Sequence, residues 1–599
     1  MKELLIVAKP GKHEREHLLL EAAEWMGISA RQITLDRPAA EQFASGVGNG
    51  KCIAAISSEA LGILRAELSP GVLGAFFRER CAHILVFTVG RPERQADLFS
   101  WLTNGCVSGV TPSGERRLFD APVSGRRFSG PFAGQTFALE RPAMVSTFDL
   151  RNPSDQSVQE ILRADGDPVF LRAERGLCEI FLLAAEALPD IAERVTATHG
   201  VEERFDRLIP LLIFLRHCFG EFSWHSAGST ARLIIDDPLL DQTYGFLDYT
   251  DLITSMHSTG YGTSMAFIPW NYRRTSKDKA AQFFRAGVNL SICVHGCDHS
   301  NREFADTEPR SLQWKALTAL ARMERHERRT DLTFDAVMVF PQGHFSSLAL
   351  RALRANGYLA TVNTTCFPTN LDAHPLTVGD FLRPAITKFH GFPIFQRRYP
   401  KRLIDFAFDA FLGRPLLIVQ HHGDFRDGYQ HIEAFVKGMQ TLDPQLGWDP
   451  LSHQLMRSCM MRSLSEHSME IRFFTRRFHF QNAHPSRTNL VFTKEEPDLS
   501  TISNVLIGGR PVPFAIKGGL LTFEHHMGAG QAIDITIVDA PGPTAPMFKP
   551  SVTHSVGVSV RRALSEFRDQ TLVRYPRLLG AATEIAARMM ITGSSRSKE

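Results

Sequence analysis

Cysteine is scarce in this sequence, and the few cysteines form no binding motif. The chain has nine in 599 residues, an odd number, with no C-x-x-C pair. A disulfide framework or a thiolate zinc site needs paired cysteines at regular spacing. We therefore expect neither, and this cysteine usage is typical of a reduced compartment.

Long apolar runs are also missing. The first run, Leu4 to Ala8, is shorter than the core of a signal peptide, and no export cleavage site follows it. The longest later run, near Leu208 to Leu215, falls far below the ~20 residues that cross a bilayer. The sequence predicts a cytoplasmic protein without a transmembrane segment.

An excess of charge of either sign is absent as well. Lysine and arginine total 67 against 64 acids, a net charge of +3. A charge balance this even gives no reason to expect nucleic acid or an acidic membrane as a partner. At roughly 150 residues per domain, the length predicts three or four units. The oligomeric state is left open.

Residues 1–225 alternate strand-like and helical stretches, which predicts a parallel sheet with helices on both faces, either flavodoxin-like or amidotransferase-like. No G-x-G-x-x-G follows the first strand, and Gly105 to Gly109 does not fit a nucleophile elbow. We expect a binding or scaffolding role for this domain. Its predicted strands are Leu4–Ala8, Arg31–Leu35, Cys52–Ser57, Ala82–Val89, Pro168–Ala173 and Leu177–Leu183.

Residues 226–460 contain seven strand candidates separated mostly by helical stretches. This pattern predicts a closed or nearly closed (β/α)7 barrel whose active site lies at the carboxyl ends of the strands. The candidates are Ala231–Asp237, Thr263–Pro269, Asn289–Gly296, Phe334–Pro341, Leu359–Thr364, Pro384–Gly391 and Pro415–His422.

The remaining chain predicts two smaller parts. Short alternating strands punctuated by glycine pairs over residues 461–545 are typical of a small β-sandwich, which we interpret as an accessory domain. Residues 546–599 begin after the proline-rich linker 540–546 and contain two amphipathic stretches, 560–572 and 577–590. These helices are expected to pack on the body, with a peripheral membrane or partner contact as the alternative.

Three strands of the predicted barrel end in acids or histidines. These are Asp236-Asp237, His295-Gly-Cys-Asp-His299 and His421-His422. Each has an ordinary reading taken alone, since the acids suit a helix N-cap and the histidines suit a loop or an exposed rim. A barrel brings such ends together, and an acid with two imidazoles suits a borderline metal such as zinc.

The order of these residues resembles the polysaccharide deacetylase (NodB homology) family, a distorted (β/α)7 barrel, over roughly residues 231–424. The resemblance implies that Asp237, His295 and His299 hold a divalent metal, with zinc expected. It implies that Asp236 is the general base, and that His421 or His422 is the general acid.

The match departs from the family pattern in three places, one of which is that no clear D-x-x-D-W motif is present. The first motif reads Ile234-Ile-Asp-Asp237, and the third, R-x-P-Y in the family, reads Val339-Phe-Pro-Gln-Gly343. The arginine that orients the base and the tyrosine of the oxyanion site are both missing from this third motif. The sequence thus resembles a divergent branch rather than a typical chitin or peptidoglycan deacetylase.

Further residues near the predicted rim complete the candidate site. The candidate substrate contacts are Tyr244, Trp270 and Asn271, together with Pro341 and Gln342 of the third motif; the aromatic rings suit sugar stacking or a plain cap on the barrel mouth. The candidate supporting residues are Asp298, His390 and Asp424.

We therefore predict a metal-dependent hydrolase that removes N- or O-linked acetyl groups from an amino sugar, a polysaccharide or a glycan precursor. One alternative is a glycoside hydrolase on a related barrel, with Asp236 paired to Asp298 or Asp424. The other is a non-catalytic glycan-binding or scaffold protein of exopolysaccharide biosynthesis.

Overall fold

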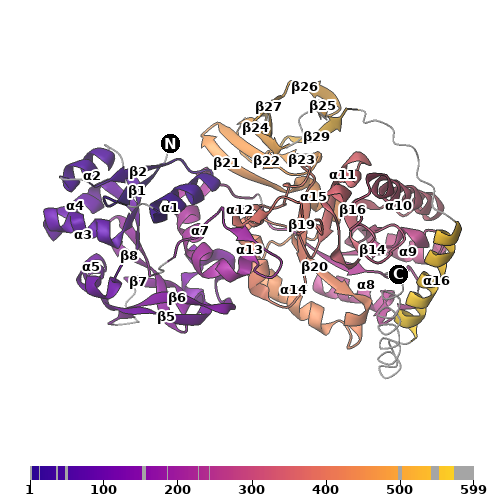
Figure 1. Cartoon of the computed structure of the whole chain (residues 1–599), viewed down its shortest axis with the longest axis horizontal. Coiled ribbons are helices and arrows are strands. Elements are labelled where there is room, and N and C mark those ends of the chain that lie inside the picture. The colour runs from indigo at the N-terminus through magenta and orange to yellow at the C-terminus, as the bar shows by residue number, and fades with distance from the viewer. Residues whose placement is uncertain are drawn as a thin grey trace, which may run out of the picture.

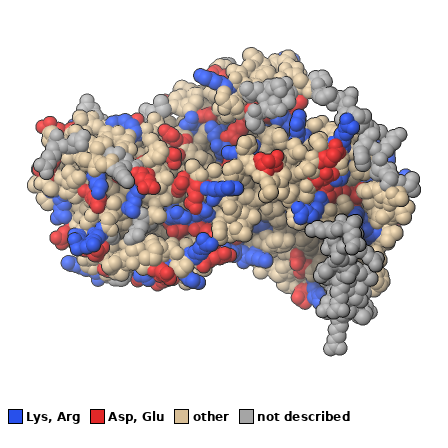
Figure 2. Space-filling view, in the orientation of Figure 1, with Lys and Arg blue, Asp and Glu red and all other residues tan. Residues whose placement is uncertain are grey.

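The computed structural model describes residues 3–571, except 12–13, 36–37, 48–50, 152–156, 185–186, 227, 242, 487, 497–501 and 541–551. Figure 1 shows the chain as three bodies, with an N-terminal sheet domain on the left, a barrel on the right and a β-sandwich above. On the face drawn in Figure 2, basic and acidic side chains are intermingled. That face thus carries no broad patch of one sign.

The N-terminal sheet is mixed, which corrects the prediction of a parallel sheet. Its order is β2-β1-β3-β4-β9-β8-β7-β5-β6; the first five strands are parallel and the others run antiparallel to their neighbours. The change of direction occurs where Arg175 pairs with Cys178 across a tight turn at Gly176, whose φ is 66°. The strands are β1 (Leu4–Ala8), β2 (Ala30–Thr34), β3 (Cys52–Ser57), β4 (Cys81–Phe87), β5 (Val107–Asp120), β6 (Thr136–Leu150), β7 (Val158–Ala164), β8 (Asp167–Arg175) and β9 (Cys178–Leu183).

Alternate residues of β1 enter two different cores, as the period of a strand requires. Leu5 and Val7 face a core closed by α2 (Ala39–Val47), α3 (Ser58–Glu67), α4 (Pro70–Arg80) and α5 (Ala96–Leu102). Leu4 and Ile6 face α1 (Glu14–Trp25) and α7 (Phe205–Phe219), and this second core continues into the barrel. The N-terminal sheet and the barrel therefore share apolar packing.

The described residues of the central region form a closed barrel of seven parallel strands, as predicted. β20 pairs with β11 from Ala231↔Leu416 to Asp236↔His421 and closes the ring. The strands are β11 (Ala231–Asp236), β14 (Thr263–Phe267), β15 (Leu290–His295), β16 (Asp335–Val339), β17 (Ala360–Asn363), β19 (Ile394–Arg398) and β20 (Leu416–His421). The surrounding helices include α8 (Tyr249–Thr259), α9 (Lys277–Ala286), α10 (Pro309–Thr330), α11 (Ser347–Ala355), α13 (Leu403–Leu412) and α14 (Gln430–Leu442).

The sixth barrel strand was predicted in the wrong place. Residues 384–391 form turns, and the strand is Ile394–Arg398. The sequence Pro384 to Gly391 is apolar because it is buried against the core, with Phe389 only 3% exposed. Only Ile386 pairs with a barrel strand, in an isolated antiparallel bridge to Ile394, so a buried turn produced the same hydrophobic pattern as a strand.

The C-terminal strands pack as two sheets around their own apolar core. The orders are β21-β22-β24-β28-β27 and β23-β29-β25-β26, and every pair is antiparallel except β22 with β24. The first sheet consists of β21 (Cys459–Ser465), β22 (Ser468–Phe473), β24 (Thr488–Glu495), β27 (Ala515–Lys517) and β28 (Leu520–Met527). The second consists of β23 (Arg477–Gln481), β25 (Ile502–Ile507), β26 (Arg510–Val512) and β29 (Ala532–Asp539).

After the sandwich the chain returns to the barrel as α16 (Val552–Gln570). The predicted linker from residue 541 and the predicted helix 577–590 lie outside the described residues. Among the described helices, none is by itself long and apolar enough to cross a membrane; α3 and α4 reach that limit only together, across a bend of 118°.

Candidate metal centre at the barrel mouth

The first two acids stand where a wholly buried strand ends. Ile234 points into the barrel core, and the period of two places Asp236 on the same inward face. Asp237 follows with a φ of 75°, a left-handed conformation that is uncommon for a residue other than glycine. The turn directs the second carboxyl across the mouth toward β15.

The two histidines are brought together by a tight loop after β15. Gly296 has a φ of 65°, and a Cβ there would lie 2.5 Å from Pro341, so only glycine fits. The Glu303 carboxylate accepts the backbone N–H groups of Cys297 (2.9 Å) and Asp298 (2.8 Å), which fixes the loop. His299 thereby turns back beside His295, with ring centroids 4.9 Å apart.

Asp237, His295 and His299 converge on one point. Asp237 Oδ1 lies 3.1 Å from Nε2 of His295 and 2.8 Å from Nε2 of His299. This oxygen is buried, yet neither approach has hydrogen-bond geometry. His295 Nδ1 donates to the Val339 carbonyl at 3.0 Å, which leaves the Nε2 lone pair facing Asp237. Two imidazole nitrogens and a carboxylate oxygen with lone pairs aimed inward fit a zinc-type divalent cation.

Electrostatics keep the Asp237 carboxyl charged. Burial works to raise its pKa, but His299 and His295 outweigh burial and hold that pKa well below its ordinary value. In return, burial works to lower the pKa of His295, and the two acids outweigh it so that the pKa is raised. Without a cation His295 therefore attracts a proton, which a divalent cation would replace.

Asp236 is held by a residue that we did not predict from the sequence. Arg397, on β19, donates from Nη1 to Oδ1 of Asp236 and from Nη2 to Oδ2, each at 2.6 Å, and both side chains are buried. Burial works to raise the pKa of Asp236, but Arg397 outweighs it and the pKa falls below its ordinary value. The arginine that pairs with Asp236 thus comes from β19 and not from residues 339–343.

His421 and His422 face different neighbours. His421 Nε2 lies 3.8 Å from Asp236 Oδ2, and the side chain is 41% exposed. His422 lies against Tyr244, with ring centroids 4.9 Å apart, and its Nε2 is 3.8 Å from Asp569 on α16. Burial lowers the pKa of His422. Of the two, His421 is the one beside Asp236 and open to solvent.

Two further residues stand beside His421. The predicted supporting residue Asp424 accepts the His421 backbone N–H at 2.8 Å, and the His421 side chain accepts the Asp424 backbone N–H in return. Tyr399, which we did not single out, is 42% exposed and stacks on the His421 ring with centroids 6.3 Å apart. It follows β19, so the misplaced strand also concealed this aromatic residue.

The predicted substrate contacts divide into exposed and buried residues. Gln342 is exposed and Trp270 is partly exposed beneath Arg322, whose guanidinium lies 4.8 Å from the ring centre. Tyr244, Asn271 and Pro341 are buried. The last three therefore contribute to the wall of the site and present no surface to solvent.

The predicted supporting residues Asp298 and His390 both lie away from the converging groups. Asp298 is ion-paired with Arg322 at 2.6 Å and with His554 of α16 at 2.9 Å. His390 precedes β19, so it lies at the amino end of that strand, opposite the acids. The prediction for His390 was wrong because the sixth strand had been assigned too early in the sequence.

α16 lies across the mouth of the barrel. Asp569 accepts the Tyr244 hydroxyl at 3.0 Å, Glu566 pairs with Arg274, and Arg561 donates to the Asp298 carbonyl at 3.1 Å. The barrel partners all follow the carboxyl ends of strands. The opposite side of the helix exposes an apolar stripe of Val556, Val560, Leu564 and Phe567. Polar contacts therefore hold this helix over the site.

Comparison with known proteins identifies distant structural neighbours only. No family model and no curated protein matches the chain. A family 4 carbohydrate esterase from Streptomyces lividans, solved with acetate, is 12% identical, with 36% of this chain and 88% of that one covered and a TM-score of 0.22. One from Bacillus anthracis is 11% identical, with 36% and 79% covered and a TM-score of 0.23.

A pseudoenzyme of the same CE4 family, also from Bacillus anthracis, has a similarly low sequence identity and TM-score. It is 9% identical, with 37% of this chain and 64% of that one covered and a TM-score of 0.25. Likenesses this weak carry no argument about activity. The case for function rests on the side chains themselves.

Proposed function

We propose that the barrel is a divalent-metal-dependent deacetylase acting on an acetylated sugar or glycan. The observation that carries the proposal is the convergence of Asp237, His295 and His299 on one point, beside a separate buried acid, Asp236. A cation bound by these three residues would polarise an acetyl carbonyl and acidify an attacking water.

The chain's own residues supply the proton transfers. Asp236 is charged and acts as the general base that takes a proton from water, and the bidentate pair with Arg397 fixes its orientation. His421 donates a proton to the leaving amine or alcohol, because it is the solvent-exposed histidine beside Asp236. Tyr399, exposed next to His421, supplies a face on which a sugar ring can stack.

The glycoside hydrolase alternative receives less support from the geometry. That chemistry needs two carboxyl groups facing one another across a cleft. Asp298 is occupied by Arg322 and His554, and Asp424 accepts the His421 backbone N–H. No described contact places either acid across a cleft from Asp236.

A non-catalytic glycan-binding protein is the second candidate, and one observation favours it. α16 contacts Tyr244 and Asp298 at the mouth and approaches His422, which restricts access to the acids. A helix that never leaves would turn the barrel into a binding scaffold.

Metal analysis combined with an acetate-release assay separates the two candidates. We expect the zinc-loaded protein to release acetate from N- or O-acetylated oligosaccharides, and Asp237→Ala and His299→Ala to lose both the barrel metal and the activity. Metal bound through Asp237 with no acetate released, alongside measurable glycan binding, would favour the scaffold. No metal dependent on Asp237 would refute the deacetylase.

A further inference from the structure

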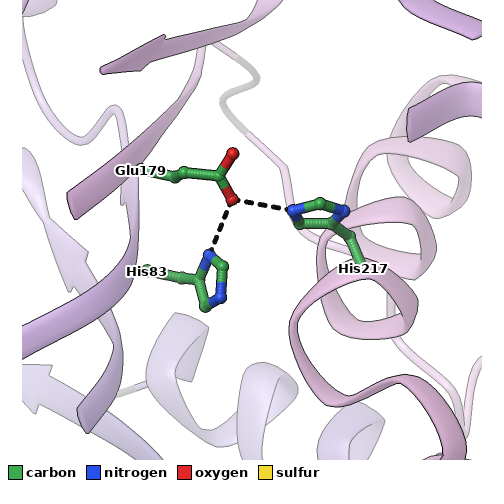
Figure 3. A group of neighbouring side chains, drawn as sticks. All are labelled: His83, Glu179 and His217. Atoms are coloured by element: carbon green, nitrogen blue, oxygen red, sulfur yellow. Dashed lines mark hydrogen bonds and ion pairs between the residues drawn. The ribbon is translucent and has the colours of Figure 1, made fainter. Parts of the chain in front are cut away.

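A second group of two histidines and an acid lies in the N-terminal domain, far from the barrel mouth. His83 on β4 and Glu179 on β9 are register partners on adjacent parallel strands, so they share one face of the sheet. His217, in the last turn of α7, comes down onto them from the helix packed above (Figure 3). Three elements distant in sequence therefore meet at this point.

The three side chains converge on a single oxygen. Glu179 Oε2 lies 3.0 Å from His83 Nδ1 and 2.8 Å from His217 Nε2, and the two rings stand at 84° to one another. His83 Nδ1 is buried and has no hydrogen-bond geometry to a partner. The corresponding distances in the barrel are 3.1 and 2.8 Å. The two groups thus have nearly the same spacing of ligand atoms.

The surroundings hold each member of the N-terminal group in place. Arg172 binds the other oxygen, Glu179 Oε1, at 2.5 and 3.1 Å, which turns Oε2 toward the imidazoles. Phe128 and Phe181 pack against the His217 ring with centroids 4.8 and 5.5 Å away. Arg172 therefore orients Glu179, and the two phenyl rings orient His217.

Access and charge agree with a bound cation. The three side chains are 15–21% exposed, enough for a water to complete the coordination. Arg172 offsets the charge of Glu179, so the group attracts a cation less strongly than the barrel group, where no arginine among the described residues forms an ion pair with Asp237. We expect a weaker site for that reason.

We propose that His83, Glu179 and His217 form a second divalent-cation site, of the two-imidazole, one-carboxylate type that suits zinc, which ties α7 to the sheet. No proton donor or second acid faces this group among its described contacts, so its role is structural. The site is independent of the proposed deacetylase, because it uses none of the same residues.

The test counts metal in the full-length chain after zinc loading and removal of excess zinc. We expect two equivalents in the wild type, one in His83→Ala, one in Asp237→Ala and none in the double variant. Glu174→Gln is the matched control, because Glu174 also contacts Arg172 but is not a ligand, and it should retain both equivalents.

A second readout covers the case in which a histidine variant fails to fold. In the Asp237→Ala background, zinc should raise the melting temperature relative to chelator, because binding to the folded state alone stabilises it. The same rise should be lost on adding Glu179→Gln. An unchanged metal content in His83→Ala, or no zinc-dependent shift in Asp237→Ala, would overturn the second site. A wild type that binds only the His83-dependent equivalent, with a metal content unchanged by Asp237→Ala, would instead count against the deacetylase.

Discussion

The two histidine–carboxylate groups of this chain have similar ligand spacing and very different neighbours. In the barrel, Asp237 and its two histidines lie beside Asp236 and His421 at the open ends of parallel strands. In the N-terminal domain, Glu179 is backed by Arg172 and phenyl rings. The ligand set decides whether a cation is bound. The residues around it decide whether chemistry follows.

The largest expected effect separates binding from chemistry within the barrel. Asp236→Asn should lower kcat by about 10²–10⁴-fold, the usual contribution of a general base, while the Asp237-dependent metal is retained. Steady-state kinetics with metal analysis on the same preparations measure both. Glu179→Gln is the matched change in the other group, and it should leave kcat within about 2-fold because no reacting atom lies there. A large loss of kcat in Glu179→Gln would contradict the proposal that only the barrel group takes part in the reaction.

His421 and His422 should differ in their effect on kcat. His421→Ala should lower kcat by about 10²-fold or more through loss of proton donation to the leaving group. His422→Ala should have a smaller effect, since His422 faces Tyr244 and Asp569. A substrate with a good leaving group, such as an aryl acetate, should partly rescue His421→Ala. Equal losses in the two variants would contradict the assignment.

Replacing Arg397, which pairs with Asp236, should change the pH dependence of both stability and activity. Because the pKa of Asp236 is lowered in the folded chain, the ion pair stabilises the fold above the ordinary carboxyl pKa, and this stabilisation is lost as pH falls through the folded value. Arg397→Gln should cost about 3–5 kcal/mol in stability near neutral pH, since it leaves a buried charge unpaired. The acid limb of kcat/KM should move to higher pH, and Arg397→Lys should move it less. An unshifted acid limb in a folded Arg397→Gln protein would exclude Asp236 as the group that titrates.

The smallest expected effect concerns α16. Asp569→Asn with Glu566→Gln removes two negative charges and so weakens the contacts to Tyr244 and Arg274, and we expect kcat/KM for longer oligosaccharides to rise a few-fold. The monosaccharide substrate should be affected less, because it needs a smaller opening. Unchanged kinetics for every chain length would mean that α16 does not limit access.

The barrel and the inward place of Asp236 follow from strand period and position, whereas the set Asp237, His295 and His299 was implied by the family resemblance and depends on turns at Asp237 and Gly296 that strand period does not give. The inward positions of β11 are 232, 234 and 236, so Asp236 is inward by alternation. The same count on β20, through Leu417 and Val419, places His421 inward and His422 outward. Once the bounds of β20 are known, this count favours His421, whereas the sequence left His421 and His422 as alternatives.

Two parts of the site could not be read in this way. Arg397 lies on β19, which the prediction placed too early because the preceding stretch, residues 384–391, is apolar. His390 was misplaced for the same reason. The second histidine–carboxylate group comes from β4, β9 and α7, and no spacing in the sequence connects them. Only the strand register His83↔Glu179 and the packing of α7 bring those side chains together.

The central claim is tested most directly by titrating metal-free protein with zinc while acetate release is measured. The His217→Ala variant is the appropriate protein, because it removes the competing N-terminal group. The account predicts that acetate release rises with zinc, levels off at about one equivalent, and is absent in His217→Ala with Asp237→Ala. Acetate release that is equally fast without metal, or no acetate release at any zinc concentration, would contradict it.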